Sequence, residues 1–161
     1  MSVSFRDSVE VVSSPCHLDA AVEEVFHLML GVHCRRRPVH LNPDLESVTA
    51  VVGFAGVLSG ACLFRCGGPT ARQIAACMTG MDFPEVDDTV KDAVGEVCNM
   101  LAGAWKGAFP ELSAGCGLSV PAVITGRDYR LRVQAPEFRL SLGYGFDDAC
   151  FEITLVCDGI R

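Results

Sequence analysis

The segment from Ser47 to Phe64 limits the possible folds of this 161-residue chain most strongly, because it carries no charged residue. An uncharged segment of this length is about long enough to cross a membrane as a helix. Serine, threonine and glycine residues interrupt its apolar residues, and no Trp or Tyr of an aromatic belt stands at its ends. Its β-branched residues on either side of Ala55–Gly56 therefore predict two buried strands, 48–54 and 57–64, joined by a turn.

The overall composition is that of one folded, acidic domain. The chain has 13 Lys and Arg against 20 Asp and Glu, a net charge of −7, and half of its residues are hydrophobic. The apolar fraction excludes a disordered chain, and the acidic balance argues against nucleic acid or an anionic membrane surface as a partner. The length and the lack of linkers predict a single domain over residues 1–161. The first seven residues lack the apolar core of a signal peptide, which predicts a cytoplasmic protein.

Nine cysteines are the most unusual feature of the composition. They cannot all pair, no C-x-x-C motif occurs, and several lie in apolar runs, so we expect thiols in a reducing compartment that mostly act as small core residues. His27, His33 and Cys34 would supply three metal ligands, but their spacing is irregular, and the prediction is that the chain has no metal site.

The remaining patterns predict an α+β fold, with an antiparallel-rich sheet and long helices on one face. Ser14 and Pro15 begin a helix with apolar positions Val22, Val25, Phe26 and Met29, which Gly31 ends. A short helix is expected over 69–78 before Gly80, and further strands over 118–124, 129–133, 138–143 and 150–156. Turns are expected at 126–128 and 145–148.

The longest helical pattern runs from Pro84 to about Phe109 and has two different faces. One face is an apolar stripe that is expected to pack on the sheet. It consists of Val86, Val90, Ala93, Val94, Val97, Leu101, Ala104 and Ala108. The other face is a polar row made of Asp88, Asp92, Glu96, Asn99, Gly103 and Lys106. We call these six residues the polar row.

The polar row and the glycines of the same helix work against helix stability. Asp88, Asp92 and Glu96 are like charges four residues apart, and each such pair lowers helix stability by a few tenths of a kcal/mol. Gly95, Gly103 and Gly107 lie within the helix, at about 1 kcal/mol each relative to alanine. Two interpretations follow. Either the face is solvated and its glycines allow close packing, or a partner with a cationic group docks on it.

Asp92, Glu96, Asn99 and Gly103 form the pattern D-x3-E-x2-N-x3-G, which resembles the signature helix of the CheC/CheX/FliY chemotaxis phosphatases, and of the CheX branch most closely. The segments 25–32, 51–60 and 118–126 are similar to this family's first helix, hairpin and following strand. The resemblance therefore covers nearly the whole chain, in order. A single motif helix is present, as in CheX-like members, which pair as homodimers. One departure is Ala104–Trp105 after the helical glycine, where members often have asparagine and a small residue.

The resemblance implies a hydrolase that removes the aspartyl phosphate of a CheY-like response regulator. It implies that Asn99 orients the attacking water and that Glu96 pairs with the regulator's lysine beside the phosphoaspartate. Asp92, Gly103 and Lys106 would face the partner. Catalytic Mg²⁺ would belong to the regulator, and this chain would need no cofactor of its own.

The chemistry suits these residue types. Phosphoryl transfer to water depends mainly on positioning and charge stabilisation, which an amide can provide by donating and accepting hydrogen bonds without adding negative charge. A carboxylate one turn away can bind a cation without facing the phosphoryl group.

Two alternatives stay open from the sequence. The same helix would also serve a module that binds a regulator without hydrolysis. Separately, Cys66 to Arg72 fits C-x5-R, the phosphate loop of cysteine phosphatases, in which a thiolate attacks and an arginine binds the phosphate. Against this second alternative, Arg65 and Gln73 stand where those enzymes have other residues, and Pro69 removes an N–H from the loop.

Overall fold

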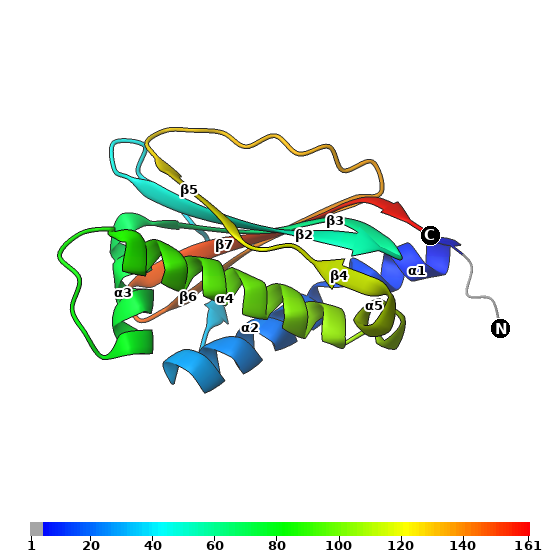
Figure 1. Ribbon diagram of the computed structural model, residues 1–161, viewed down its shortest axis with the longest axis horizontal. Helices are drawn as coiled ribbons and strands as arrows, with labels where there is room; N and C mark the ends of the chain where they lie inside the picture. Colours follow the sequence, from blue (N-terminus) through cyan, green and yellow to red (C-terminus); the bar gives the residue numbers. More distant parts are fainter. Residues whose placement is uncertain (1–4) are drawn as a thin grey trace.

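In the computed structural model, which describes residues 5–161, one seven-stranded antiparallel sheet carries helices on one of its faces (Figure 1). The helices are α1 (Phe5–Val12), α2 (Pro15–Leu30), α3 (Gly68–Thr79), α4 (Asp88–Gly107) and α5 (Pro110–Gly115). The strands are β1 (Arg35–Arg36), β2 (Ser47–Gly56), β3 (Leu58–Gly67), β4 (Cys116–Leu118), β5 (Ala122–Gly126), β6 (Phe138–Phe146) and β7 (Ala149–Ile160). The strand order is β1-β6-β7-β3-β2-β4, and β5 also pairs with β2. The α+β prediction is confirmed.

The uncharged segment forms the predicted hairpin at the centre of the sheet. β2 and β3 pair in register from Ser47 opposite Gly67 to Phe54 opposite Gly60. The turn contains Gly56, whose φ of 125° suits glycine, and a Cβ atom there would stand 2.2 Å from the carbonyl oxygen of Gly115. Because both strands have neighbours on either side, the lack of charge over residues 47–64 reflects burial in a sheet. None of the helices in the described part is long and apolar enough to cross a membrane.

The core lies between the sheet and the helices. Phe26 of α2 stacks on Phe151 of β7 with ring centroids 4.6 Å apart, and Phe64 of β3 lies 4.9 Å from Phe151. All three side chains are fully buried. This aromatic cluster fixes α2 against the middle of the sheet, beside α4. Helix α4 carries the six residues of the polar row, which we call the α4 row from here on.

The ends of α2 and α3 follow their sequence signals. Pro15 occupies the first turn of α2, and Gly31 ends this helix in the left-handed conformation. Gly80 ends α3 in the same way. Met29 departs from the prediction, because it is 45% exposed while Leu30 takes the buried position.

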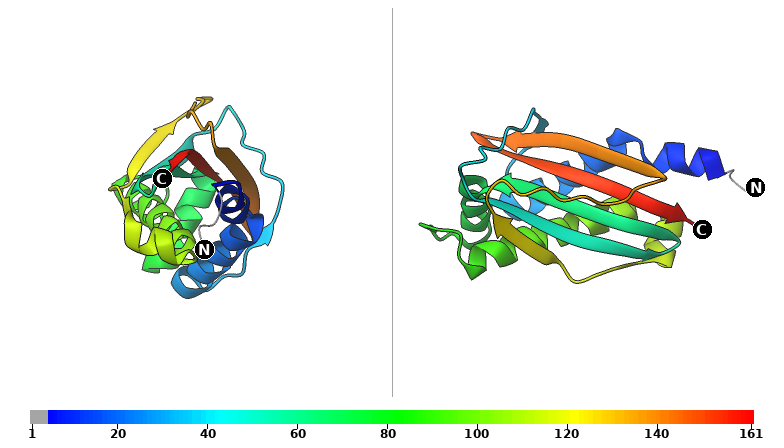
Figure 2. Two further views of the ribbon diagram at one scale, coloured as in Figure 1. Left: turned by 90° about the vertical axis from the view of Figure 1, so that its right-hand side faces the viewer. Right: turned by 90° about the horizontal axis from the view of Figure 1, so that it is seen from above.

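Residues 129–133, predicted as a strand, pair with no other strand. They belong to the connection between β5 and β6, which runs along the sheet face opposite the helices (Figure 2, right). Tyr129, Leu131 and Val133 are half-buried while their neighbours are exposed. The alternation of half-buried and exposed residues therefore shows only that one side of this segment is covered. A paired strand and an unpaired chain that lies on a sheet both meet this condition.

The predicted strand 118–124 is divided in two. β4 pairs with one end of β2 and β5 with the other, and the residues between them, Ser119 to Pro121, form no ladder. Ser119 still connects this segment to β2. Its backbone N–H donates to the carbonyl of Gly53 at 2.9 Å, and its Oγ accepts from the Gly53 N–H at 2.8 Å. Proline at position 121 lacks an N–H for a ladder, which is consistent with this break.

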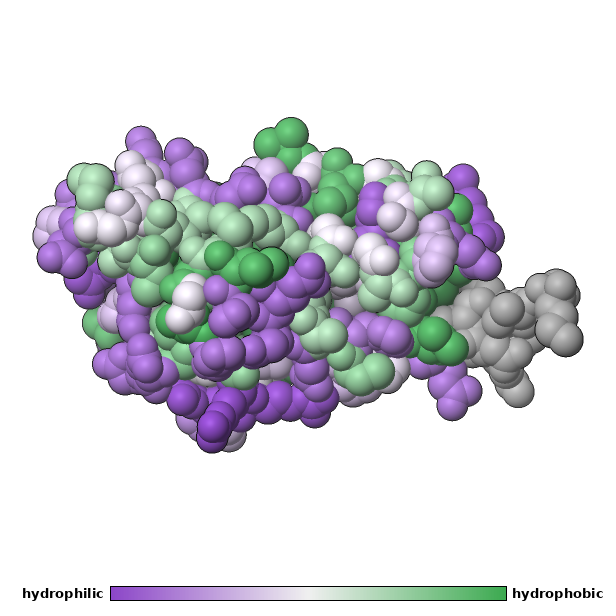
Figure 3. Space-filling model, turned by 90° about the horizontal axis from the view of Figure 1, so that it is seen from below, coloured by the Kyte–Doolittle hydropathy of each residue, from purple (hydrophilic) through white to green (hydrophobic). Residues whose placement is uncertain are grey.

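Three short elements were not predicted: α1, β1 and α5. The chain turns within both predicted segments, at 127–128 and 147–148, where Asp128 and Asp147 have φ of 47° and 51°. The turns are shorter than predicted, because Gly126, Gly145 and Phe146 belong to strands. Five cysteines are buried, in agreement with the prediction of core thiols: Cys62, Cys66, Cys98, Cys116 and Cys157. The helical side, seen from below, presents hydrophilic surface interrupted by apolar patches (Figure 3).

Candidate functional site

Helix α4 carries the candidate site and is shorter than its sequence pattern predicts. It begins at Asp88, because the carboxylate of Asp87 caps it by accepting a hydrogen bond from the Val90 N–H at 2.9 Å. The apolar stripe is mostly confirmed, although Ala104 is half-buried and Ala108 is exposed. The buried residues of α4 are Val90, Ala93, Val94, Gly95, Val97, Cys98, Leu101, Ala102 and Trp105.

Trp105 belongs to this core. Its side chain is 1% exposed, and its ring lies 5.5 Å from that of Phe54 and 5.3 Å from that of Phe109. The tryptophan that departs from the family pattern therefore fills space under the sheet and leaves the α4 row unobstructed.

The α4 row lies on the opposite side of the helix. Asp92 and Glu96 are exposed, whereas Asn99, Gly103 and Lys106 are half-buried. Steps of three and four residues along α4 bring these five residues to one surface. The structure thus keeps the residues singled out by the sequence together.

Asn99 faces the break between β4 and β5. A Cβ atom on Gly95, one turn before it, would lie 3.4 Å from Cβ of Pro121, and one on Gly103, one turn after it, would lie 4.0 Å from Cδ1 of Leu118. Asn99 lies between these two glycines along α4, four residues from each, so we infer that its side chain borders the segment Leu118–Pro121. This neighbourhood explains why Asn99 is half-buried while Glu96 is exposed.

The carboxylates of the row have little internal compensation. Asp88 lies 3.8 Å from Lys91, while Asp92 and Glu96 form no ion pair with another described residue. Across residues 5–161, we also find no hydrogen bond to the side chains of Glu96 or Asn99. Nor do these acids gather with described histidines or cysteines into a group that could hold a metal ion. The side chains of Glu96 and Asn99 are therefore available to a partner.

Lys106 is engaged within the chain. Its ammonium group donates to the carbonyl oxygen of Cys116 at the start of β4. This bond ties the last turn of α4 to the sheet edge. A contact between Lys106 and a partner stays a prediction.

The cysteine-phosphatase alternative conflicts with the structure. Cys66 lies in β3 with a fully buried side chain, and burial raises the pKa of its thiol far above the usual range. Helix α3 begins at Gly68, so the residues before Arg72 form a helical turn in place of a phosphate loop. Arg72 donates to the carbonyl of Phe83. A neutral thiol inside the core cannot act as the nucleophile that this mechanism needs.

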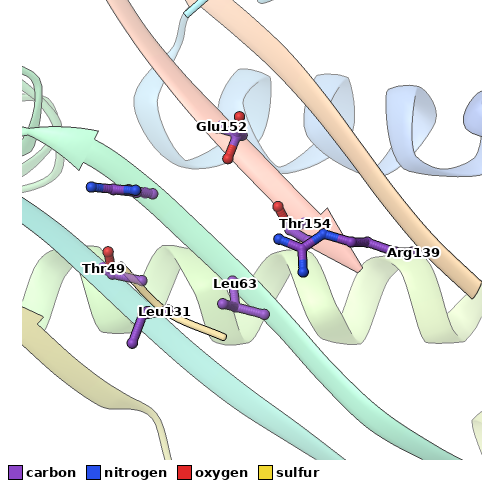
Figure 4. A pocket seen from close by; sticks show the side chains of 7 residues that line it. Thr49, Leu63, Leu131, Arg139, Glu152 and Thr154 are labelled. Carbon is purple, nitrogen blue, oxygen red and sulfur yellow. The ribbon is translucent and has the colours of Figure 1, made fainter. Parts of the chain in front are cut away.

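A small depression on the opposite face of the sheet does not compete as a substrate site. Its volume is about 50 Å³, whereas small-molecule sites usually occupy about 300–1,000 Å³. Figure 4 shows side chains from four strands and the β5–β6 connection around it. They are Thr49, Leu63, Arg65, Leu131, Arg139, Glu152 and Thr154. A site on the exposed surface of α4 suits a macromolecular substrate better.

The structure adds one feature that sequence reasoning missed, the connection from Ser119 to Pro121 beside the row. Val120 in this connection is 86% exposed, an unusual position for a large apolar residue. The proline inside a strand-like pattern was the available signal, since proline is excluded from paired central strands. The connection that passes beside α4 thus carries an exposed apolar side chain.

Comparisons with known proteins agree with this geometry. Residues 48–142 match the family model "Chemotaxis phosphatase CheX". The CheY-P phosphatase CheX of Thermotoga maritima is 29% identical over 119 residues, which cover 71% of this chain and 77% of that protein.

Solved structures share the fold at lower identity. The chemotaxis protein CheX from Vibrio vulnificus has a TM-score of 0.77 at 18% identity, covering 89% of this chain and 95% of that one. CheX in the CheX–CheY–BeF3–Mg²⁺ complex from Borrelia burgdorferi has a TM-score of 0.70 at 21% identity, covering 89% and 96%. Because the family model spans more than half of the chain, this chain belongs to the chemotaxis phosphatase CheX family.

Proposed function

We propose that this protein hydrolyses the aspartyl phosphate of a CheY-like response regulator and that Glu96 and Asn99 carry the reaction. The supporting observation is that these two side chains lie one turn apart on the same surface of α4 without internal hydrogen bonds in the described chain. Family membership and the CheY-P phosphatase from Thermotoga maritima support the substrate class.

In this mechanism Asn99 holds the attacking water. The amide oxygen accepts a hydrogen bond from the water, and the amide N–H₂ donates to it or to a phosphoryl oxygen. The water oxygen then forms a bond to phosphorus while the bond from phosphorus to the aspartate oxygen breaks. Inorganic phosphate and the free carboxylate are the products. Most of the rate gain comes from alignment, which a side chain on a rigid helix provides.

Glu96 acts on the regulator rather than on the phosphate. Its exposed carboxylate would bind the lysine ammonium that the regulator keeps beside its phosphoaspartate, which orients the two proteins. The Borrelia complex contains Mg²⁺ with CheY and BeF3. We accordingly assign the Mg²⁺ of the reaction to the regulator, so that hydrolysis needs no cofactor bound to this chain.

The rest of the row would form the docking surface. Asp92 adds a second exposed carboxylate one turn before Glu96, and Gly103 leaves room for the partner backbone to approach. Lys106 contributes to this surface indirectly, because its hydrogen bond to the carbonyl of Cys116 holds β4 against the end of α4. We further propose a homodimer in the cytoplasm, which the resemblance to CheX-like members supports. Sedimentation or light scattering over a range of concentrations tests the dimer.

The test is release of inorganic phosphate from a purified phosphorylated regulator in the presence of Mg²⁺. Wild-type protein should accelerate release, and Asn99→Ala should abolish most of this acceleration, with a loss of about 10²-fold or more for a positioning group. Asp158→Asn, which alters an exposed residue of β7, is the matched control and should match wild type. Equal rates for wild type and Asn99→Ala would overturn the proposed mechanism.

The same variant distinguishes a catalyst from a module that binds the regulator without hydrolysis. Asn99→Ala should still bind the regulator carrying a stable phosphate mimic, because the docking contacts of Glu96 and Asp92 remain. If wild type binds the regulator but does not change phosphate release, the protein is a binding module.

A further inference from the structure

We propose that Glu23, His27 and His33 bind one divalent transition-metal ion, with Zn²⁺ as the best-suited ion. Each residue offers a ligand atom, and these atoms lie within 4.8 Å of one another. All three side chains are exposed. The proposal is independent of the α4 row and of the proposed phosphatase activity.

The end of α2 brings the three residues together. Glu23 and His27 are four residues apart on the helix, so they lie on one face. Gly31 then takes a left-handed conformation at φ 68°, and its N–H donates to the carbonyl of His27 at 3.1 Å. The Val32 N–H donates to the carbonyl of Phe26 at 3.3 Å, which completes a turn that folds His33 back onto the helix.

The side chains already contact one another. Nδ1 of His33 lies 2.5 Å from Oε1 of Glu23, and the rings of His27 and His33 stack with centroids 4.8 Å apart and planes at 23°. Ligand atoms about 2.0–2.1 Å from a tetrahedral ion stand roughly 3.3 Å apart. Small rotations of exposed side chains therefore suffice to close the cluster on an ion.

The ligand set selects the class of ion. Two imidazoles and a carboxylate are ligands of Zn²⁺ and similar ions, whereas Mg²⁺ and Ca²⁺ prefer oxygen. His27 lies in the last turn of α2, where the partial negative charge of the helix end favours a cation. A fourth position would be filled by water, which makes this an open site.

Binding would link two parts of the fold. Glu23 and His27 belong to α2, while His33 precedes β1, the edge strand that pairs with β6. An ion at this point joins the end of the helix to the edge of the sheet. Since the folded state alone presents all three ligands in this arrangement, the ion should stabilise the protein against unfolding.

The experiment is titration of the reduced, metal-free protein with Zn²⁺, followed by calorimetry and by thermal unfolding. Wild type should bind one ion at this cluster and unfold at a higher temperature with Zn²⁺. His27→Ala and His33→Ala should each weaken this binding by about tenfold or more and remove the thermal shift. Glu23→Gln should weaken it in the same direction. His40→Ala changes an exposed histidine outside the cluster and should behave as wild type.

The exposed thiols Cys16 and Cys77 and the half-buried thiol of Cys34, which follows His33, are the competing ligands. Co²⁺ distinguishes them, because thiolate ligands add a strong near-ultraviolet charge-transfer band that imidazole and carboxylate do not. The site predicts visible Co²⁺ bands without that charge-transfer band, and these bands should be unchanged in protein that carries Cys16→Ser, Cys34→Ser and Cys77→Ser together. Thiolate bands, unchanged Zn²⁺ affinity in both histidine variants, or no binding by wild type would overturn the proposal.

Discussion

Gly95 of α4 lies directly against Val123 of β5, since a Cβ atom on Gly95 would stand 3.3 Å from Cγ2 of Val123. This close approach holds the helix to the sheet edge that borders Asn99. Gly107 near the end of the same helix has nothing within 4 Å of the corresponding position. Glycine at position 95 therefore allows the close contact with β5, whereas no contact excludes a side chain at position 107.

Gly107→Ala should stabilise the protein by about 0.5–1 kcal/mol, because alanine has the higher helix propensity and meets no atom. Gly95→Ala should lose that gain, since its methyl group presses on Val123 and Pro121. Chemical denaturation followed by the fluorescence of the buried Trp105 measures both. Equal stabilisation by the two substitutions would show that the helix–sheet contact at Gly95 is loose.

Charge reversal at Glu96 tests docking in the proposed reaction. Glu96→Lys should raise the regulator concentration for half-maximal phosphate release by about tenfold or more, because a lysine would face the partner's lysine. Glu96→Gln removes only the attraction and should have a smaller effect. Glu111→Lys on α5 makes the same charge change at another exposed carboxylate and serves as the control. Unchanged half-maximal concentrations in Glu96→Lys would remove Glu96 from the docking surface.

Replacing Cys66 separates its packing role from chemistry. Cys66→Ala should keep phosphatase activity and lower the free energy of unfolding by about 1 kcal/mol, because it removes a buried sulfur from the core. In the native wild type, thiol reagents should modify the exposed Cys16 and Cys77 before Cys66. Loss of phosphate release in a folded Cys66→Ala protein would revive the cysteine mechanism.

Asp19 should make stability depend on acid pH. A hydrogen bond from Arg36 lowers the pKa of Asp19, and one from Tyr144 lowers it further, against the opposing effect of burial. Arg36 donates at 2.9 and 2.6 Å and Tyr144 at 2.7 Å. Because the folded pKa is below the unfolded one, this contribution is complete above about pH 4–5 and is lost as pH falls through the folded value.

Asp19→Asn should therefore cost about 1 kcal/mol at pH 7, a small figure because the side chain of Asp19 is 37% exposed. The difference from wild type should shrink below about pH 3. Urea unfolding at both pH values measures it. A difference that stays constant between pH 7 and pH 3 would mean that the ionised carboxylate does not stabilise the fold.

The sequence by itself determined the elements whose signals are local. The uncharged segment predicted a buried hairpin, Gly31 and Gly80 predicted helix ends, and the spacing along 84–109 separated a core face from the α4 row. Spacing also placed Glu96 and Asn99 in one row, because residues three apart on one helix are neighbours in any tertiary fold, and the family resemblance then singled out these two. Periodicity and capping act within a few residues, so one chain contains this information.

Only the tertiary structure decided relations between distant segments. It placed residues 129–133 across the sheet face without strand pairing, although their alternation resembles that of a strand. It buried Cys66 and Trp105, placed the Ser119–Pro121 connection beside Asn99, and brought His33 back onto Glu23 and His27. The physical reason is that burial and side-chain contact depend on which surfaces pack together. That choice is made by the whole chain as its sheet and helices exclude water from a common core.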